Sequence, residues 1–145
     1  MSSDPFDLER FVTAQEAHAT YTRARAELRA GAKQSHWMWF VFPQIAGLGS
    51  SPTARRYAIR SLDEAVAYLA HPVLGPRLRE CVDIACSLPT NDARAVFGGI
   101  DAMKLRSSLT LFLRAAPGNE SFTRALEKFF GGAPDQRTLE LLASD

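Results

Sequence analysis

The chain has 145 residues, of which 46% are hydrophobic and 23% are charged, and its formal net charge is +1. This length fits one domain with a single sizeable core, and the composition excludes a disordered chain. The nearly balanced charge gives no strong attraction to nucleic acid or to a membrane surface, so neither is an expected partner.

Helix signals fill the N-terminal third of the chain. Asp4-Pro5 combines a helix cap with a first-turn proline and predicts a short helix over residues 6–12. A capping box that begins at Thr13 starts a longer helix, which a glycine ends. Ser35 can cap a short aromatic helix that the next proline must end.

The central part of the chain carries further helix starts. Ser51 precedes a proline and opens a short helix, and Ser61 begins a second capping box. In the next helix, over residues 74–88, Cys81 and Cys86 point to different faces. An intrahelical disulfide is therefore not expected, and reduced thiols favour a cytoplasmic location. No apolar run approaches the roughly 20 residues of a membrane span, and no charged and apolar leader is present.

Polar caps also divide the last third of the chain. Residues 91–97 form a short turn that two glycines end. Three side chains cap the last three predicted helices: Asp101, Asn119 and Asp135. The first of these helices covers residues 102–115, and Met103 lies on its apolar side.

Strand signals are scarce, because alternation of β-branched residues never lasts long enough. The elements predict an all-α fold, a single domain over residues 1–145 built as an orthogonal bundle of about seven to nine short helices. Its core covers about residues 4–132, and a C-terminal helix covers about residues 135–143.

The most unusual stretch, residues 35–49, places both tryptophans between polar groups. A core needs Trp37 and Trp39, but it needs neither His36 before them nor Gln44 after the proline. Either tryptophan could stack on a base or sugar, while His36 acts as an acid or base and Gln44 orients a reactive centre or a water. The alternative interpretation is that both tryptophans belong to the core and that His36 only bonds to the backbone.

Two further segments predict an anion site. The turn that ends at Gly49 leads into a helix N-terminus, and Arg55 and Arg56 lie one turn inside that helix, so amides and guanidinium groups could hold negative charge. The turn matches no known phosphate-loop pattern, and a capped helix after a flexible turn is the alternative. Lys104, Arg106 and Ser107 interrupt an otherwise apolar helix, so they face solvent, bond to other helices or line a site.

Other kinds of site find no support in the pattern. The three histidines have no cysteine or carboxylate at metal-ligand spacing, so no metal is expected. No cofactor is expected, since the dinucleotide fingerprint and the phosphate loop are both missing. The nucleophile elbow of α/β-hydrolases is missing as well.

Ten positions carry a resemblance to a known family: His36, Trp37, Trp39, Pro43, Gln44, Gly47, Gly49, Lys104, Arg106 and Ser107. The chain resembles the bacterial family catalogued as domain of unknown function 1810, whose members often carry the label calpastatin. The resemblance runs from Asp4-Pro5-Phe6 to Phe130-Gly131-Gly132. It implies a compact, mostly helical single domain and brings no established activity. Calpastatin itself is a disordered inhibitor, whereas this aromatic content and these helix caps predict a chain that folds alone.

Together these observations predict that the aromatic segment and the Lys104 helix meet in one cleft. That cleft would bind a small anionic ligand, phosphorylated or nucleotide-like. If the protein is an enzyme, we expect hydrolysis of a glycosidic or phosphate-linked bond with His36 as the acid–base, and Asp92 and Asp101 are the nearest candidate carboxylates. The alternative is a non-enzymatic protein-interaction module, with the aromatic segment as core or as partner surface.

Overall fold

The computed structural model describes residues 4–143, and most of them are helical. In chain order the helices are α1 (Glu9–Glu16), the 3-10 turn η1 (Ala17–Ala19), α2 (Thr20–Ala30), α3 (Met38–Val41), α4 (Pro52–Arg56), α5 (Leu62–Ala70), α6 (Leu74–Cys86), α7 (Ala93–Phe97), α8 (Gly99–Ala115), α9 (Glu120–Phe130) and α10 (Gln136–Ala143). The predicted all-α class is confirmed. Within residues 4–143 the β structure is limited to an isolated parallel bridge between Ile45 and Ile59.

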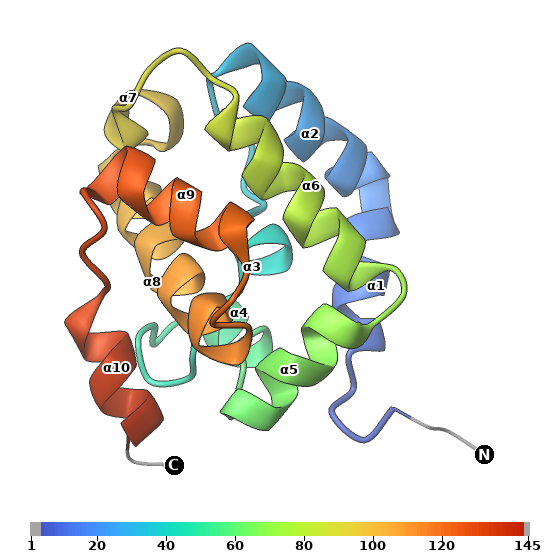
Figure 1. Ribbon diagram of the computed structural model, residues 1–145. Coiled ribbons are helices and arrows are strands. Elements are labelled where there is room, and N and C mark those ends of the chain that lie inside the picture. The colour runs from blue at the N-terminus through green and yellow to red at the C-terminus, as the bar shows by residue number, and fades with distance from the viewer. Residues whose placement is uncertain (1–3, 144–145) are drawn as a thin grey trace.

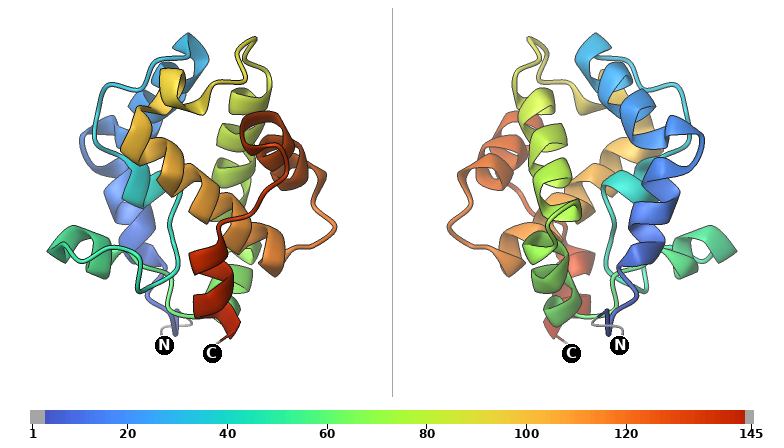
Figure 2. Two further views of the ribbon diagram at one scale, coloured as in Figure 1. Left: turned by 90° about the vertical axis from the view of Figure 1, so that its left-hand side faces the viewer. Right: turned by 90° about the vertical axis from the view of Figure 1, so that its right-hand side faces the viewer.

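The longest helix, α8, organises the bundle (Figure 1). It packs against α5, α7, α9 and α10, while α6 packs against α2, α5 and α9. The single-turn helix α3 lies among these groups and contacts α1, α6 and α8. In both views of Figure 2, α4 stands at the edge of the molecule. The aromatic segment is thus placed at the centre of the bundle, and the turn that follows it leads out to the surface.

Aromatic rings from helices far apart in the sequence join the core. Phe11 of α1 lies with its ring centroid 5.2 Å from that of Tyr68 of α5, and Tyr68 is also 5.2 Å from Phe112 of α8. Phe112 in turn lies 6.2 Å from Phe122 of α9. Such pairs contribute about 0.5–1.5 kcal/mol beyond the burial of their area. This chain of rings fixes four helices relative to one another.

Several predicted helix ends are confirmed. Side chains at four predicted starts accept a backbone N–H of the first turn: Ser51, Ser61, Asn119 and Asp135. Gly31 and Gly131 have φ angles of 70° and 63°, the left-handed conformation expected of a glycine just past a helix. These ends follow from local chemistry alone.

The N-terminal helices differ from the prediction. Thr13 lies inside α1 rather than at a helix start. The helix predicted from residue 6 begins only at Glu9, because Asp7 has a φ angle of 53°, and Asp4 accepts the backbone N–H of Leu8 at 2.7 Å from outside the helix. The predicted single helix after Thr13 is broken at η1. His18 and Ala19 there have φ angles of 56° and 54°, which an uninterrupted α-helix does not allow.

Two other predicted ends are wrong. Ser35 does not cap α3, because its hydroxyl donates to the carboxylate of Glu27 and Trp37 takes the N-cap position. Residues 91–97 contain the short helix α7 rather than a turn, because the Asp92 carboxylate accepts backbone N–H groups of its first turn.

The start and one face of α8 also differ from the prediction. The helix begins at Gly99, so Asp101 lies in its first turn and does not cap it. Met103, predicted on the apolar side, is 71% exposed, and its neighbour Ile100 is 75% exposed. This end of α8 therefore carries apolar side chains on the protein surface.

The two cysteines are free thiols, as predicted. Burial raises the pKa of the Cys81 thiol to about 12, and burial also raises the pKa of the Cys86 thiol. Because the thiolate is the nucleophilic form, neither cysteine is an activated nucleophile.

Candidate functional site

The two tryptophans of the aromatic segment point to different faces. Trp37 is fully buried, and its indole Nε1 donates to a carboxylate oxygen of Glu27 at 2.9 Å. Trp39 is only half-buried and lines hollows on the surface. Residues two positions apart on a helical turn do not face the same way, which explains the division. Trp37 is therefore a core residue, and Trp39 is the tryptophan that a ligand can reach.

Glu27 of α2 holds the segment that leads into α3. Its carboxylate accepts the backbone N–H groups of Gln34 at 2.7 Å and Ser35 at 2.9 Å, in addition to the Ser35 hydroxyl and the Trp37 indole. Burial opposes ionisation of Glu27, but these hydrogen bonds outweigh it and lower its pKa to about 2. An ionised carboxylate thus fixes the position of α3.

Lys104 of α8 meets Trp39 of α3. The Lys104 Nζ lies 4.6 Å from the centroid of the Trp39 ring, within the range of a cation–π contact. These residues are far apart in the sequence, and the packing of α3 against α8 brings them together. The aromatic segment and the lysine-bearing helix therefore share one surface.

Trp39 and Lys104 line three adjoining hollows, which we together call the Trp39–Lys104 cleft. The smallest, the inner pocket, has a volume of about 120 Å³. Its lining also includes Phe42, Gln44 and Tyr57. The inner pocket is therefore small, and its lining combines three aromatic rings and an amide with the cations of Arg55, Arg60 and Lys104.

The other two hollows are larger. The histidine hollow has a volume of about 400 Å³ and is lined by Lys33, His36 and Asp101 in addition to the shared pair. The outer hollow has a volume of about 490 Å³ and extends toward α10, with Leu48 and Ser107 in its lining. Both volumes lie in the range of roughly 300–1,000 Å³ that is usual for small-molecule sites.

The histidine hollow holds more positive than negative charge. Lys33, whose side chain is only 6% exposed, places its Nζ 2.7 Å from one carboxylate oxygen of Asp101. The Lys104 Nζ lies 3.6 Å from the other oxygen. Two ammonium groups thus face one carboxylate. The His36 ring is exposed at the same hollow, and within residues 4–143 it has no hydrogen-bond partner.

Backbone pairing builds one wall of the inner pocket. The Gln44 carbonyl accepts the N–H of Ile59 at 2.8 Å, and the N–H of Ala46 donates to the Ile59 carbonyl at 2.8 Å. The side chain of Gln44 is half-buried, and its amide makes no hydrogen bond with the described part of the chain. The backbone is therefore satisfied here, while the amide is left to face the pocket.

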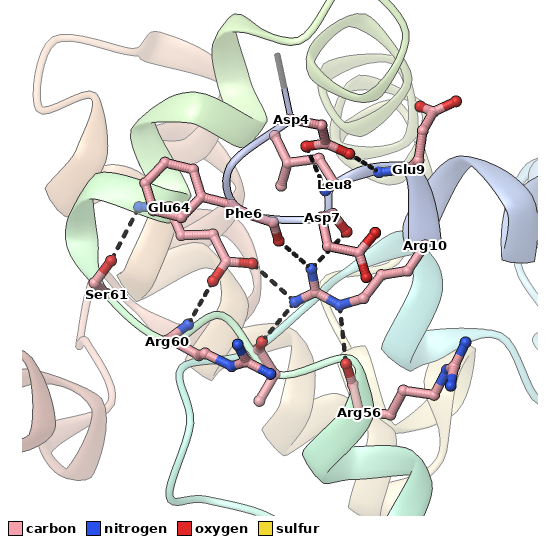
Figure 3. Close-up of polar contacts among 11 residues, drawn as sticks. Asp4, Phe6, Asp7, Leu8, Glu9, Arg10, Arg56, Arg60, Ser61 and Glu64 are labelled. Carbon is pink, nitrogen blue, oxygen red and sulfur yellow. Dashed lines mark hydrogen bonds and ion pairs between the residues drawn. The ribbon is translucent and has the colours of Figure 1, made fainter. Parts of the chain in front are cut away.

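Arg10 of α1 holds the segment that pairs with Gln44 and Ala46, residues 57–60 (Figure 3). Its Nε donates to the Arg56 carbonyl at 2.9 Å, and one terminal nitrogen donates to the Ala58 carbonyl at 2.9 Å. The same nitrogen donates to the Glu64 carboxylate at 2.8 Å. The wall is thus tied both to α1 and to α5.

The remaining donors of Arg10 are also used. Its second terminal nitrogen donates to the carbonyls of Phe6 at 2.7 Å and Asp7 at 2.8 Å. The side chains of Arg10 and Glu64 are 7% and 2% exposed. All five N–H groups of a guanidinium therefore have protein partners, in a buried ion pair that the sequence patterns did not reveal.

Two more of the predicted site residues reach the cleft. Gly49 lines the inner pocket and the outer hollow, and a Cβ at this position would lie 2.6 Å from the Cβ of Ala54. Ser107 lines the outer hollow, but it is 5% exposed and its hydroxyl donates to the Met103 carbonyl at 3.1 Å. The predicted residues His36, Trp39, Gln44, Gly49, Lys104 and Ser107 therefore gather at one cleft.

Arg56 and Arg106 lie outside the cleft. The exposed Arg56 side chain points away from the Arg10 network (Figure 3), and its Nε lies 3.3 Å from the Tyr57 hydroxyl. The Arg106 Nε donates to the Ala133 carbonyl at 2.9 Å, and its guanidinium lies over the ring of Phe130. Arg106 thus ties α8 to the segment before α10.

Cationic side chains other than Arg56 and Arg106 line the cleft. Arg55 and Arg60 line the inner pocket, and Lys33 lies in the histidine hollow. Of the two arginines predicted in α4, only Arg55 reaches the pocket, because one residue along a helix turns a side chain by about 100°. Lys33 carries no sequence signal, because a lysine in a loop is normally solvated.

The described residues offer neither a metal site nor a membrane-spanning helix. No three His, Cys, Asp or Glu side chains in this range are grouped so that they could hold a metal ion. No helix in the same range is both long enough and apolar enough to cross a bilayer.

The chain is similar to a solved structure of the conserved hypothetical protein Rv1873 from Mycobacterium tuberculosis. The two share 54% sequence identity and superpose with a TM-score of 0.93, over 97% of this chain and 99% of that one. No curated protein matches the sequence significantly. The family described as "Protein of unknown function (DUF1810)" matches residues 5–142. The chain therefore belongs to the DUF1810 family.

Proposed function

We propose that the protein binds a small anionic ligand, phosphorylated or nucleotide-like, in the Trp39–Lys104 cleft. The observation that carries the proposal is the shared pair itself, a half-buried indole with an ammonium 4.6 Å from its ring, at the junction of all three hollows. An aromatic face and a cation side by side suit a ligand that has both a flat group and a negative charge.

The charge distribution supports an anion. Besides Lys104, the cleft is lined by four cations, Lys33, Arg55, Arg60 and Arg137, and by two carboxylates. Asp101 already contacts both lysines, and Asp135 accepts a backbone N–H of α10. Hydrogen bonds to charged groups contribute about 1.5–3 kcal/mol each. Two such contacts with a phosphate would therefore dominate the affinity of a small ligand.

Calorimetric titration of the whole protein with UMP, AMP, ribose 5-phosphate and inorganic phosphate tests the proposal. Lys104→Met should weaken the binding of every ligand that binds by about tenfold or more, since it removes one charged contact. Lys128→Met is the matched control, because the Lys128 Nζ also lies over a ring, 5.6 Å from Phe129, but outside the cleft. Unchanged affinity in Lys104→Met, or no binding of any probe, would overturn the proposal.

Hydrolysis of the bound ligand is a second candidate, favoured by His36 and Asp101 lining one hollow. His36 would take a proton from a water in the histidine hollow. Gln44, predicted to orient that water, lines the inner pocket and the outer hollow instead, and the other predicted carboxylate, Asp92, only caps α7. Release of base or phosphate from UMP by the wild type, reduced about 100-fold or more in His36→Gln, is the expected result. No release by the wild type contradicts hydrolysis and leaves binding intact.

The alternative function, a protein-interaction module, is favoured by the exposed apolar side chains of α8. Ile100 and Met103 are 75% and 71% exposed and line the rim of the cleft. A double variant, Ile100→Ser with Met103→Ser, distinguishes the two functions. Under the ligand proposal it retains Lys104-dependent binding of a phosphate probe, whereas an interaction module binds no such probe in either form.

A further inference from the structure

We infer that the ligand of the Trp39–Lys104 cleft carries a single six-membered ring with adjacent hydrogen-bond donor and acceptor, as in a pyrimidine nucleotide, and that Gln44 selects this ring in the inner pocket. The inference rests on the proposed function and adds the class of ligand and the residue that selects it.

The size of the inner pocket limits the ring. Its volume is about 120 Å³, whereas the adjoining hollows measure about 400 and 490 Å³. An apolar cavity of roughly 150 Å³ accepts one benzene molecule. The inner pocket is somewhat smaller than that cavity, so it accepts at most one six-membered ring, and the fused double ring of a purine exceeds it.

The walls of the inner pocket suit a flat group. Trp39, Phe42 and Tyr57 line it, together with the aliphatic side chains of Met38 and Ile45. Stacking of a base on an aromatic side chain contributes about 1–3 kcal/mol. The Arg10 network holds the Tyr57 side of the pocket, so these walls are already in place before a ligand binds.

The Gln44 amide requires the ligand to offer both a hydrogen-bond donor and an acceptor. It lines the inner pocket and makes no hydrogen bond with residues 4–143. A ligand that covered this amide with an apolar edge would leave its donor and acceptor unsatisfied, at a cost of about 1–3 kcal/mol. A ring edge with one donor next to one acceptor satisfies both, and rotation of the amide lets Gln44 pair with either the uracil or the cytosine edge.

The positions of the cations place the phosphate at the open side of the inner pocket. Lys104 lies at the junction of the hollows, and Arg55, like Arg60, lines the inner pocket but is itself exposed to solvent. Both side chains can reach an anionic group attached to the ring through a sugar. The ring thus enters the small pocket while the phosphate stays in the larger, more solvated hollows.

Calorimetric titration of the wild type with UMP, CMP, AMP and ribose 5-phosphate tests the inference. UMP and CMP should bind at least about tenfold more tightly than AMP and than ribose 5-phosphate, which has no ring to place. Gln44→Leu should abolish most of this preference and leave the affinity for ribose 5-phosphate unchanged. Gln136→Leu, an exposed glutamine at the start of α10, should behave as the wild type.

The outcomes separate the inference from the proposed function. Equal or tighter binding of AMP, or unchanged binding of UMP to Gln44→Leu, overturns the pyrimidine inference even where binding still depends on Lys104. No binding of any probe overturns both. The comparison of ligands on the wild type needs no variant, so a folding defect in Gln44→Leu would not weaken the test.

Discussion

The hydrogen bonds of Arg10 with Glu64 and four backbone carbonyls form the Arg10–Glu64 network, which shares the wall at residues 57–60 with the Trp39–Lys104 cleft. The two regions differ in whether their polar side chains have hydrogen-bond partners. In the network every donor of a buried guanidinium has a protein acceptor. In the cleft the Gln44 amide and the His36 ring have no partner within residues 4–143. The contrast indicates that the network stabilises the fold, whereas the cleft is left open for a ligand.

The largest expected effect comes from breaking the network. Arg10→Met leaves the Glu64 carboxylate buried without its cation and should lower the free energy of unfolding by about 3–5 kcal/mol, as urea denaturation would measure. Arg56→Met, which removes an exposed guanidinium, should change it by less than about 0.5 kcal/mol. Similar losses in the two variants would remove the distinction between network and surface.

The two tryptophans test the same contrast with one residue type. Trp37→Phe removes an indole donor to the ionised Glu27 and should cost about 2–3 kcal/mol of stability. Trp39→Phe should cost less than about 1 kcal/mol, because Trp39 is half-buried and its indole has no hydrogen bond to residues 4–143. A greater loss of stability in Trp39→Phe would make Trp39 a core residue and contradict its place in the cleft.

Acid should lower the free energy of unfolding, because protonation of Glu27 weakens its hydrogen bonds to the segment before α3. The folded pKa of Glu27, about 2, lies below its ordinary value of 4.5. Its stabilisation is therefore complete above about pH 4.5 and is lost as the pH falls toward 2. Because the side chain is partly exposed, we expect a loss of about 1–2 kcal/mol. Urea unfolding at about pH 6 and pH 3 should show this loss, and Glu27→Gln should show a smaller one; equal losses would contradict the assignment.

The smallest effect concerns an unpaired group away from the cleft. Ser108 is 1% exposed, and its hydroxyl has no partner in the part of the chain that the structure describes. Ser108→Ala should raise the free energy of unfolding by about 1 kcal/mol, whereas Ser107→Ala should lower it slightly, since the Ser107 hydroxyl donates to a carbonyl. A decrease in both variants would show that Ser108 is satisfied in solution.

Local chemistry made much of the fold predictable. Caps such as Ser61 and Asn119 and glycines such as Gly31 act on neighbouring backbone groups, so their effect can be seen in a short window of sequence. The break at His18 and Ala19 could not be predicted this way, because no glycine marks the left-handed conformation that both residues adopt.

The candidate site was only partly predictable, for a related reason. A polar residue such as Lys104 or Gln44 within an apolar stretch is visible in the sequence, but its partner is not. Arg106 gave the same signal as Lys104 and instead bonds to the Ala133 carbonyl. Arg10 gave none, because its acceptors on Arg56 and Glu64 lie 46 and 54 residues away.

The contact between Gly49 and Ala54 has a consequence for engineering. A methyl group at position 49 would lie 2.6 Å from the Ala54 Cβ. The lack of a side chain at Gly49 therefore determines how closely the turn approaches α4 where both line the inner pocket. Real Cβ atoms do not approach so closely, and Gly49→Ala would push the turn and α4 apart. The shape of the entrance can therefore be changed without altering any charge around it.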